Sequence, residues 1–112
     1  MGILATGQVA IVHFPFSDLS QSKLRPAVVL AEAGRGDWLL CQITSKSYGD
    51  TRAIQITAAD FTQGSLRATS YARPAKLFTA HTSLVAGQIG ELHPASFSAI
   101  RDAAARLIQS GK

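Results

Sequence analysis

Short runs of β-branched and aromatic residues, each ended by glycine, proline or a polar stretch, fill the first ninety residues of the chain. Branched and aromatic side chains fit the pleated, half-buried surface of a sheet, so such runs are typical of short strands. The clearest runs lie at residues 8–14, 27–31, 38–44 and 53–57. They predict a mainly β fold, and the unbroken apolar character of 27–31 predicts a strand buried on both faces.

The breaks between these runs predict where the chain turns. A polar stretch at 17–24 indicates an exposed loop, and the glycines of 34–37 indicate a tight turn. Residues 65–79 are expected to be extended, with Pro74 marking an edge position or a bend, since proline cannot donate to a ladder. Further loops or turns are expected at 45–51 and 60–64, and a last apolar run at 83–89.

The C-terminal segment has a different period. Its apolar residues are spaced like one face of an α-helix, with a proline in the expected first turn and a glycine just past the end. They are Phe97, Ile100, Ala104, Leu107 and Ile108, between Pro94 and Gly111. About six short strands and this helix predict an antiparallel, partly open barrel capped by the helix, as a single domain of residues 1–112.

Composition and charge indicate the kinds of partner that the chain binds. Charged residues make up 16% and hydrophobic residues 46% of the chain, so we expect a partner to cover part of the surface, most simply in a homodimer. Eleven Lys and Arg against seven Asp and Glu give a net charge of +4, which suits a polyanionic partner.

Several classes of protein are disfavoured by what the sequence lacks. The start has no signal-peptide pattern and no apolar stretch reaches the ~20 residues of a membrane span, so we expect a cytoplasmic protein without a membrane partner. The lone Cys41 fits a reducing compartment and is expected to be a buried small hydrophobe. His13, His81 and His93 have no ligand partner at metal-binding spacing, and we expect no metal and no cofactor.

The remaining candidates for a functional site are polar and cationic residues at strand ends. Arg25 ends the first long loop, and Pro26 holds its backbone in extended geometry. Thr44, Ser45 and Lys46 follow one another where the third strand ends, so two hydroxyls and an ammonium can together cradle a phosphate.

These residues lie in segments that resemble a known family. The stretches FPFSDLSQSKLRPAVVLAE, LLCQITSK and SYARPAKLFTAHTSLVAGQIGEL are similar to the MazF/PemK (Kid-like) toxins, which are sequence-selective endoribonucleases. The resemblance covers residues 7–108, and Arg-Pro followed by Ala-Val-Val-Leu is its most specific part.

The resemblance implies an SH3-like barrel with a terminal helix, a symmetric homodimer, and metal-independent cleavage of single-stranded RNA to a 2′,3′-cyclic phosphate. It also implies a cognate antitoxin with a disordered, often acidic tail, and DNA binding by the complex with it. Arg25 and Thr44 match the pair regarded as catalytic in the family, and their side chains are expected to converge on one phosphate. Ser45 and Lys46 are expected to contact the flanking phosphate.

One departure from the family concerns the segment 70–76. Some relatives carry an arginine and then an acid there, where this chain has Tyr71 and Arg73. With no carboxylate between residues 60 and 91, a local general base is missing, and His81 is a possible replacement. We expect Arg73, Lys76 and, in the first loop, Lys23 to contact RNA, and Tyr71 to stack on a base. The loops around Gln21 and Tyr48 are expected to set the RNA motif.

Two alternatives follow from the same residues. The missing acid favours a non-catalytic SH3-like module that binds nucleic acid or a peptide. A toxin of this fold acting on another target, such as a topoisomerase, is the third hypothesis.

Overall fold

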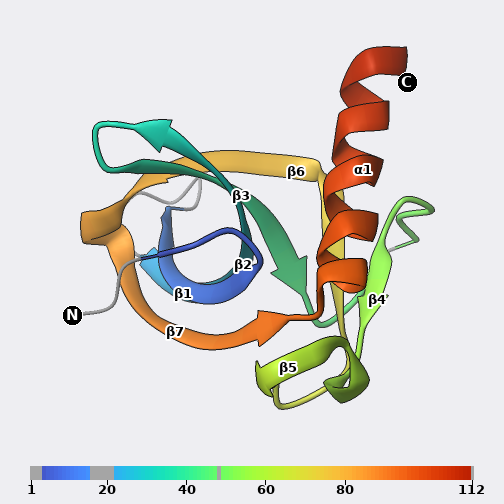
Figure 1. Cartoon of the computed structure of the whole chain (residues 1–112), viewed down its shortest axis with the longest axis horizontal. Helices are drawn as coiled ribbons and strands as arrows, with labels where there is room; N and C mark the ends of the chain where they lie inside the picture. Colours follow the sequence, from blue (N-terminus) through green and yellow to red (C-terminus); the bar gives the residue numbers. More distant parts are fainter. Residues whose placement is uncertain (1–3, 16–21, 48, 112) are drawn as a thin grey trace.

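The computed structural model describes residues 4–15, 22–47 and 49–111, and these form one curled antiparallel sheet and a terminal helix. Within that part of the chain the sheet has seven strands in the order β4-β6-β3-β2-β1-β7-β5. The elements are β1 (Gln8–Pro15), β2 (Ser22–Gly34), β3 (Asp37–Thr44), β4 (Ile54–Ile56), η1 (Ala58–Asp60), β5 (Phe61–Gly64), β6 (Ser70–His81), η2 (Thr82–Leu84), β7 (Val85–Leu92) and α1 (Pro94–Ser110). The strands curl into an open barrel, and α1 lies along β6 on one side of it (Figure 1). The predicted mainly β, partly open antiparallel barrel with a C-terminal helix is confirmed.

The two faces of the curled sheet carry separate apolar cores. The helix-side core packs under α1 and consists of Val9, Val28, Leu30, Cys41, Ile43, Ile56, Phe61, Ala72, Leu92 and Ile100. The second core lies on the opposite face and consists of Leu4, Ala10, Val12, Ala27, Val29, Leu40 and Ala80. Successive residues of β1, β2 and β3 alternate between the two cores, because successive side chains of a strand point to opposite faces. The predicted burial of 27–31 on both faces is confirmed for Ala27 to Leu30.

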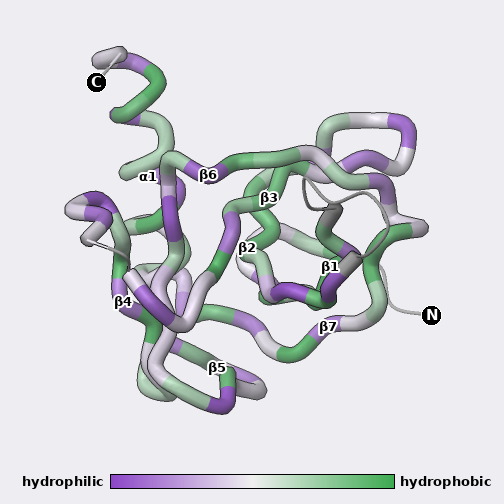
Figure 2. Tube along the Cα trace, turned by 180° about the vertical axis from the view of Figure 1, so that it is seen from behind, coloured by the Kyte–Doolittle hydropathy of each residue, from purple (hydrophilic) through white to green (hydrophobic). Residues whose placement is uncertain are grey.

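Hydropathy along the chain follows the same alternation. The tube in Figure 2 changes between hydrophilic and hydrophobic colours within single strands, as expected where successive side chains point to opposite faces. The predicted turn at 34–37 is confirmed, with positive φ at Gly34, Arg35 and Gly36.

Two predicted irregular segments are strands instead. Residues 22–24, expected in a loop, belong to β2, because Lys23 pairs with Phe14 and extends the ladder beyond Arg25. Residues 61–64, expected in a turn, form β5, which pairs with β7. Cross-strand pairing, not local composition, determines both.

The extended segment expected at 65–79 begins later than predicted, because β6 starts at Ser70. Pro74 lies at a bend and beyond the residues of β6 that pair with β4, which are 70–72, so β3 is the one strand beside β6 from there on in the described ranges. Cys41 pairs with Leu77 and Ile43 with Ala72, so β6 carries four residues, 73–76, opposite a single residue of β3. We call 73–76 the β6 bulge.

The C-terminal helix matches its predicted pattern. Ile100 and Ala104 are buried against the sheet, and Gly111 ends the helix with a left-handed φ of 75°. Ile108, at the far end of the same stripe, is 69% exposed. No helix in the described ranges is long and apolar enough to cross a membrane.

Asp60 fastens the start of β5 to the start of α1. One oxygen of its carboxylate accepts the Thr57 backbone N–H at 2.8 Å, and the other accepts the Ser96 hydroxyl at 2.8 Å. Its backbone carbonyl accepts the His93 N–H. The Thr57 N–H bond is the main reason that the pKa of Asp60 lies below its ordinary value of 3.8.

Replacing Asp60 with alanine should therefore lower the free energy of unfolding by about 1–2 kcal/mol at pH 7. A carboxyl whose folded-state pKa is depressed stabilises the fold above its unfolded pKa and loses that contribution as pH falls through the folded value. In urea unfolding at pH 7 and pH 3, the difference in the free energy of unfolding between wild type and Asp60→Ala should be smaller at pH 3. An equal gap at both values would show that the charge of Asp60 is irrelevant.

Candidate functional site

Polar side chains from three neighbouring strands form one row across the sheet. Tyr71 of β6 pairs with Thr44 of β3, and Arg25 of β2 pairs with Val12 of β1. The β2–β3 ladder includes Ala27 with Gln42, and continuing this register by two residues brings Arg25 level with Thr44. Adjacent strands are roughly 4.8 Å apart, so a phenol, a hydroxyl and a guanidinium arise from about 10 Å of sheet.

The members of this row share one face of the sheet. Val12 belongs to the second core, and its partner Arg25 must point the same way because directly paired residues do. Thr44 follows Ile43, which points into the helix-side core, and therefore also faces the second-core side. The side chains expected to converge, Arg25 and Thr44, thus lie on the same face of adjacent strands.

Thr44 is more enclosed than the sequence indicated. It is only 4% exposed, whereas Arg25 and Tyr71 on either side of it are half-buried. Its Oγ1 accepts the Lys46 backbone N–H at 3.3 Å, which turns the chain as β3 ends. The hydroxyl can still donate its own proton.

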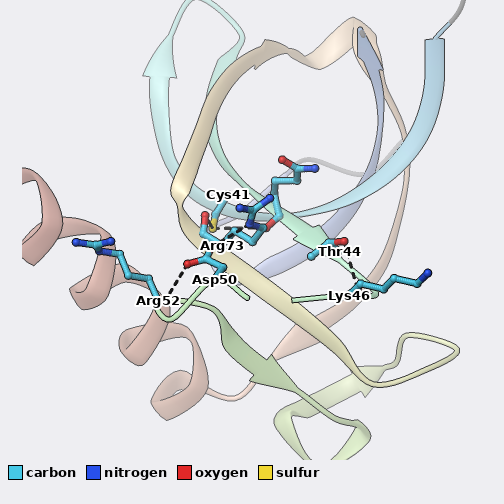
Figure 3. Close-up of polar contacts among 7 residues, drawn as sticks. Cys41, Thr44, Lys46, Asp50, Arg52 and Arg73 are labelled. Atoms are coloured by element: carbon cyan, nitrogen blue, oxygen red, sulfur yellow. Dashed lines mark hydrogen bonds and ion pairs between the residues drawn. The ribbon is translucent and has the colours of Figure 1, made fainter. Parts of the chain in front are cut away.

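The remaining predicted contacts lie around the row and not in it. Lys23 is exposed and lies two residues before Arg25 on β2. Ser45 and Lys46 are exposed just after Thr44, and the Lys46 side chain extends away from it (Figure 3). Lys76 is exposed in the β6 bulge.

Arg73 has a partner that sequence reasoning missed. Its Nε donates to Oδ2 of Asp50 at 2.9 Å, and the two side chains are 21% and 11% exposed. Because of this bond the pKa of Asp50 lies below its ordinary value. The residues are 23 positions apart, and no periodicity links a loop acid to a strand bulge.

A pocket of about 470 Å³ opens at the same strand ends, on the other face of the sheet. Pro26 and Ser45, which directly follow Arg25 and Thr44, form part of its wall. Its lining is mainly apolar and includes Ile11, Leu66 and Ile89. Arg67 is the cationic residue of the lining.

Three other residues named from the sequence are His81, Gln21 and Tyr48. His81 pairs with Asp37 at the opposite end of β6 from Tyr71, so the suggestion that it serves as the base at this row is wrong. Gln21 lies outside the described residues, as does Tyr48. In the described ranges, no three His, Cys, Asp or Glu side chains gather as a metal ion would require.

Comparison with known proteins identifies the fold and the family. Solved structures with the same fold include MazE-MazF (Form-III) from Deinococcus radiodurans, with a TM-score of 0.77, 18% identity, and coverage of 96% of this chain and 98% of that one. An endoribonuclease in complex with its cognate antitoxin from Mycobacterial species has a TM-score of 0.73, 16% identity, and coverage of 97% and 96%. The Mycobacterium tuberculosis toxin MazF-mt6 has a TM-score of 0.66, 18% identity, and coverage of 89% and 96%.

A comparison with curated protein sequences gave no match. The family model for the PemK-like, MazF-like toxin of type II toxin–antitoxin systems, however, matches residues 5–108, which is nearly the whole chain. By that match the chain belongs to the PemK/MazF toxin family.

Proposed function

We propose that this toxin is an endoribonuclease that cleaves single-stranded RNA without a metal ion. The observation that carries the proposal is the cross-strand row, in which Arg25 and Thr44 lie on one face of adjacent strands with Tyr71 beside them. A guanidinium and a hydroxyl from neighbouring strands can both reach one phosphate, and an aromatic ring beside them can stack on a base.

RNA supplies its own nucleophile in this reaction. The 2′-oxygen attacks the adjacent phosphorus, the bond to the 5′-oxygen breaks, and the products end in a 2′,3′-cyclic phosphate and a 5′-hydroxyl. Overall, one proton leaves the 2′-hydroxyl and one reaches the departing 5′-oxygen. The protein's main task is to hold the phosphate in line and to stabilise the charge that develops on it.

Arg25 is assigned the stabilisation of that charge. A guanidinium is planar and can make two parallel hydrogen bonds to phosphate oxygens. Thr44 is assigned a hydrogen bond to a phosphate oxygen, donated by the hydroxyl proton. Lys23, Ser45 and Lys46 are exposed around the row and are assigned contacts with the flanking phosphates.

A second candidate function draws on the burial of Thr44. At 4% exposure its hydroxyl offers little surface to a substrate, and its bond with Lys46 already gives it a role in shaping the strand end. A barrel that binds RNA without cleaving it is consistent with that observation.

Partners are part of the proposal. We assign the chain to the cytoplasm, as a single domain that forms a homodimer and binds a cognate antitoxin. Low charge content and the exposed Leu24 and Ile108 support a covered surface, and the net charge of +4 supports an acidic partner segment.

The decisive experiment incubates the purified protein with mixed-sequence RNA in EDTA. Wild type should cleave, and Arg25→Ala should be slower by about 100-fold or more, the typical cost of losing one donor to a developing oxyanion. Arg35→Ala is the matched control, since it removes one positive charge from the turn at the other end of β2. Loss of cleavage in both variants would indicate a general effect of charge, and RNA binding without cleavage by wild type would select the second candidate.

The role of the buried hydroxyl is tested by Thr44→Val, which keeps the shape of the side chain. If the hydroxyl contacts the phosphate, cleavage should slow about 100-fold or more. The lost bond from the Lys46 N–H should lower the free energy of unfolding by only about 1 kcal/mol, so the variant still folds. The measurement is the initial rate on the same RNA, together with a melting curve. An unchanged rate would assign Thr44 to the strand end alone.

A further inference from the structure

The loop after β3 and the β6 bulge are joined by one ion pair. Asp50 lies in the 45–53 loop between β3 and β4, of which residues 45–47 and 49–53 are described. Its carboxylate uses both oxygens: Oδ2 accepts Arg73 Nε–H, and Oδ1 accepts the Arg52 backbone N–H at 2.9 Å. The Asp50 backbone N–H donates to Ser47 and its carbonyl accepts from Ala53. Asp50 is therefore the residue that both folds this loop and ties it to the sheet (Figure 3).

The bulge needs such a tie. Its four residues face one residue of β3, so the ladder offers them few partners. The Cys41 thiol donates to the Arg73 carbonyl at 3.2 Å, and the thiol stays protonated because burial raises the pKa of Cys41 to about 12. The backbone of Arg73 is thus held from β3 and its side chain from the loop.

Both tied segments begin at the cross-strand row. The bulge starts two residues after Tyr71, and the loop starts directly after Thr44 with Ser45 and Lys46. Because Tyr71 and Thr44 are cross-strand partners, a shift of the loop against the bulge would alter the spacing of the groups assigned to the phosphate.

We propose that Asp50 and Arg73 are positioning residues, which lock the 45–53 loop against the β6 bulge and so fix the geometry of the row for RNA cleavage. This rests on the proposed function, and it assigns Arg73 to the scaffold and not to direct contact with RNA. The pair is mostly enclosed, which distinguishes it from the solvent-exposed pair of Arg101 and Asp102 on α1.

Asp50 is a poor candidate for the missing general base. The bond from Arg73 lowers its pKa, so the carboxylate has little affinity for a proton, and both of its oxygens already accept hydrogen bonds. Holding two segments together is the role that its contacts support.

The test removes the charge of Asp50 without changing its shape. Cleavage of end-labelled mixed-sequence RNA in EDTA under single-turnover conditions gives a maximal rate and a half-saturating concentration. Asp50→Asn should lower the maximal rate about 10- to 100-fold, as expected for a small misplacement of reacting groups, without weakening RNA binding. Asp102→Asn, which removes the charge from an exposed Arg–Asp pair, is the matched control and should cleave like wild type.

A charge swap separates positioning from a direct role of either residue. Asp50→Arg and Arg73→Asp should each be impaired, and the double variant should recover part of the lost rate. The swap restores the ion pair with the same total length, whereas an arginine at position 50 cannot accept the Arg52 N–H. Melting curves and near-ultraviolet circular dichroism check that each variant folds. Where Asp50→Asn does not fold, recovery in the folded double variant carries the test.

The outcomes are distinguishable. If Asp50→Asn cleaves as fast as wild type, the positioning proposal is wrong although the protein is a nuclease. If Asp50→Asn binds RNA more tightly and cleaves faster, the proposal is likewise wrong and Arg73 contacts RNA. If the double variant cleaves as slowly as the single variants, the ion pair does not determine the cleavage rate and the positioning proposal is wrong. If wild type cleaves no RNA, the proposed function fails and takes this inference with it.

Discussion

The pairing of β2 with β3 is the constraint on which the site depends. Side chains alternate with a period of two, so a slip of one residue in this ladder would send Thr44 to the helix-side core and leave Arg25 facing the other way. The tight turn at 34–37 sets the register of this hairpin, and the burial of Ala27, Val28 and Val29 against Leu40 and Cys41 stabilises the pairing. The energy that positions two polar groups at the strand ends therefore comes from the apolar residues behind them.

The sequence predicted those features that depend on local pattern. Strand runs rich in branched residues, the glycine turn at 34–37 and the helical spacing after Pro94 each report a local preference, and each is confirmed. The strand positions of residues 22–24 and 61–64 were missed because both form by pairing with distant segments. Polar composition describes a residue's neighbours in the chain, not its neighbours in the sheet.

The same distinction applies to the site. The family resemblance predicted that Arg25 and Thr44 converge. The ladder provides a physical reason, since each lies two residues beyond the Ala27–Gln42 pair on its own strand. The burial of Thr44 and the partner of Arg73 could not be predicted, because the first depends on cross-strand neighbours and the second on a loop that returns to a bulge. The segment 61–90 has no carboxylate of its own, and no local pattern indicates that Asp50, 23 residues before Arg73, returns to β6 from the preceding loop.

Charge in this molecule is used in two ways. The exposed cations around the row leave a positive strand end that suits a polyanion, whereas the arginine of the bulge is neutralised inside the fold. An arginine count alone would assign all of them to RNA. Their surroundings separate the groups that can meet a phosphate from the one that holds the scaffold.

The central claim is that Arg25 and Thr44 act on one phosphate, and a double-mutant cycle measures this directly. Cleavage rates of wild type, Arg25→Ala, Thr44→Val and the double variant give the coupling between the two side chains. Joint action on one phosphate predicts strong coupling, with the double variant about as slow as the slower single variant. Rate losses that simply multiply would show that the two groups act independently, which would contradict it.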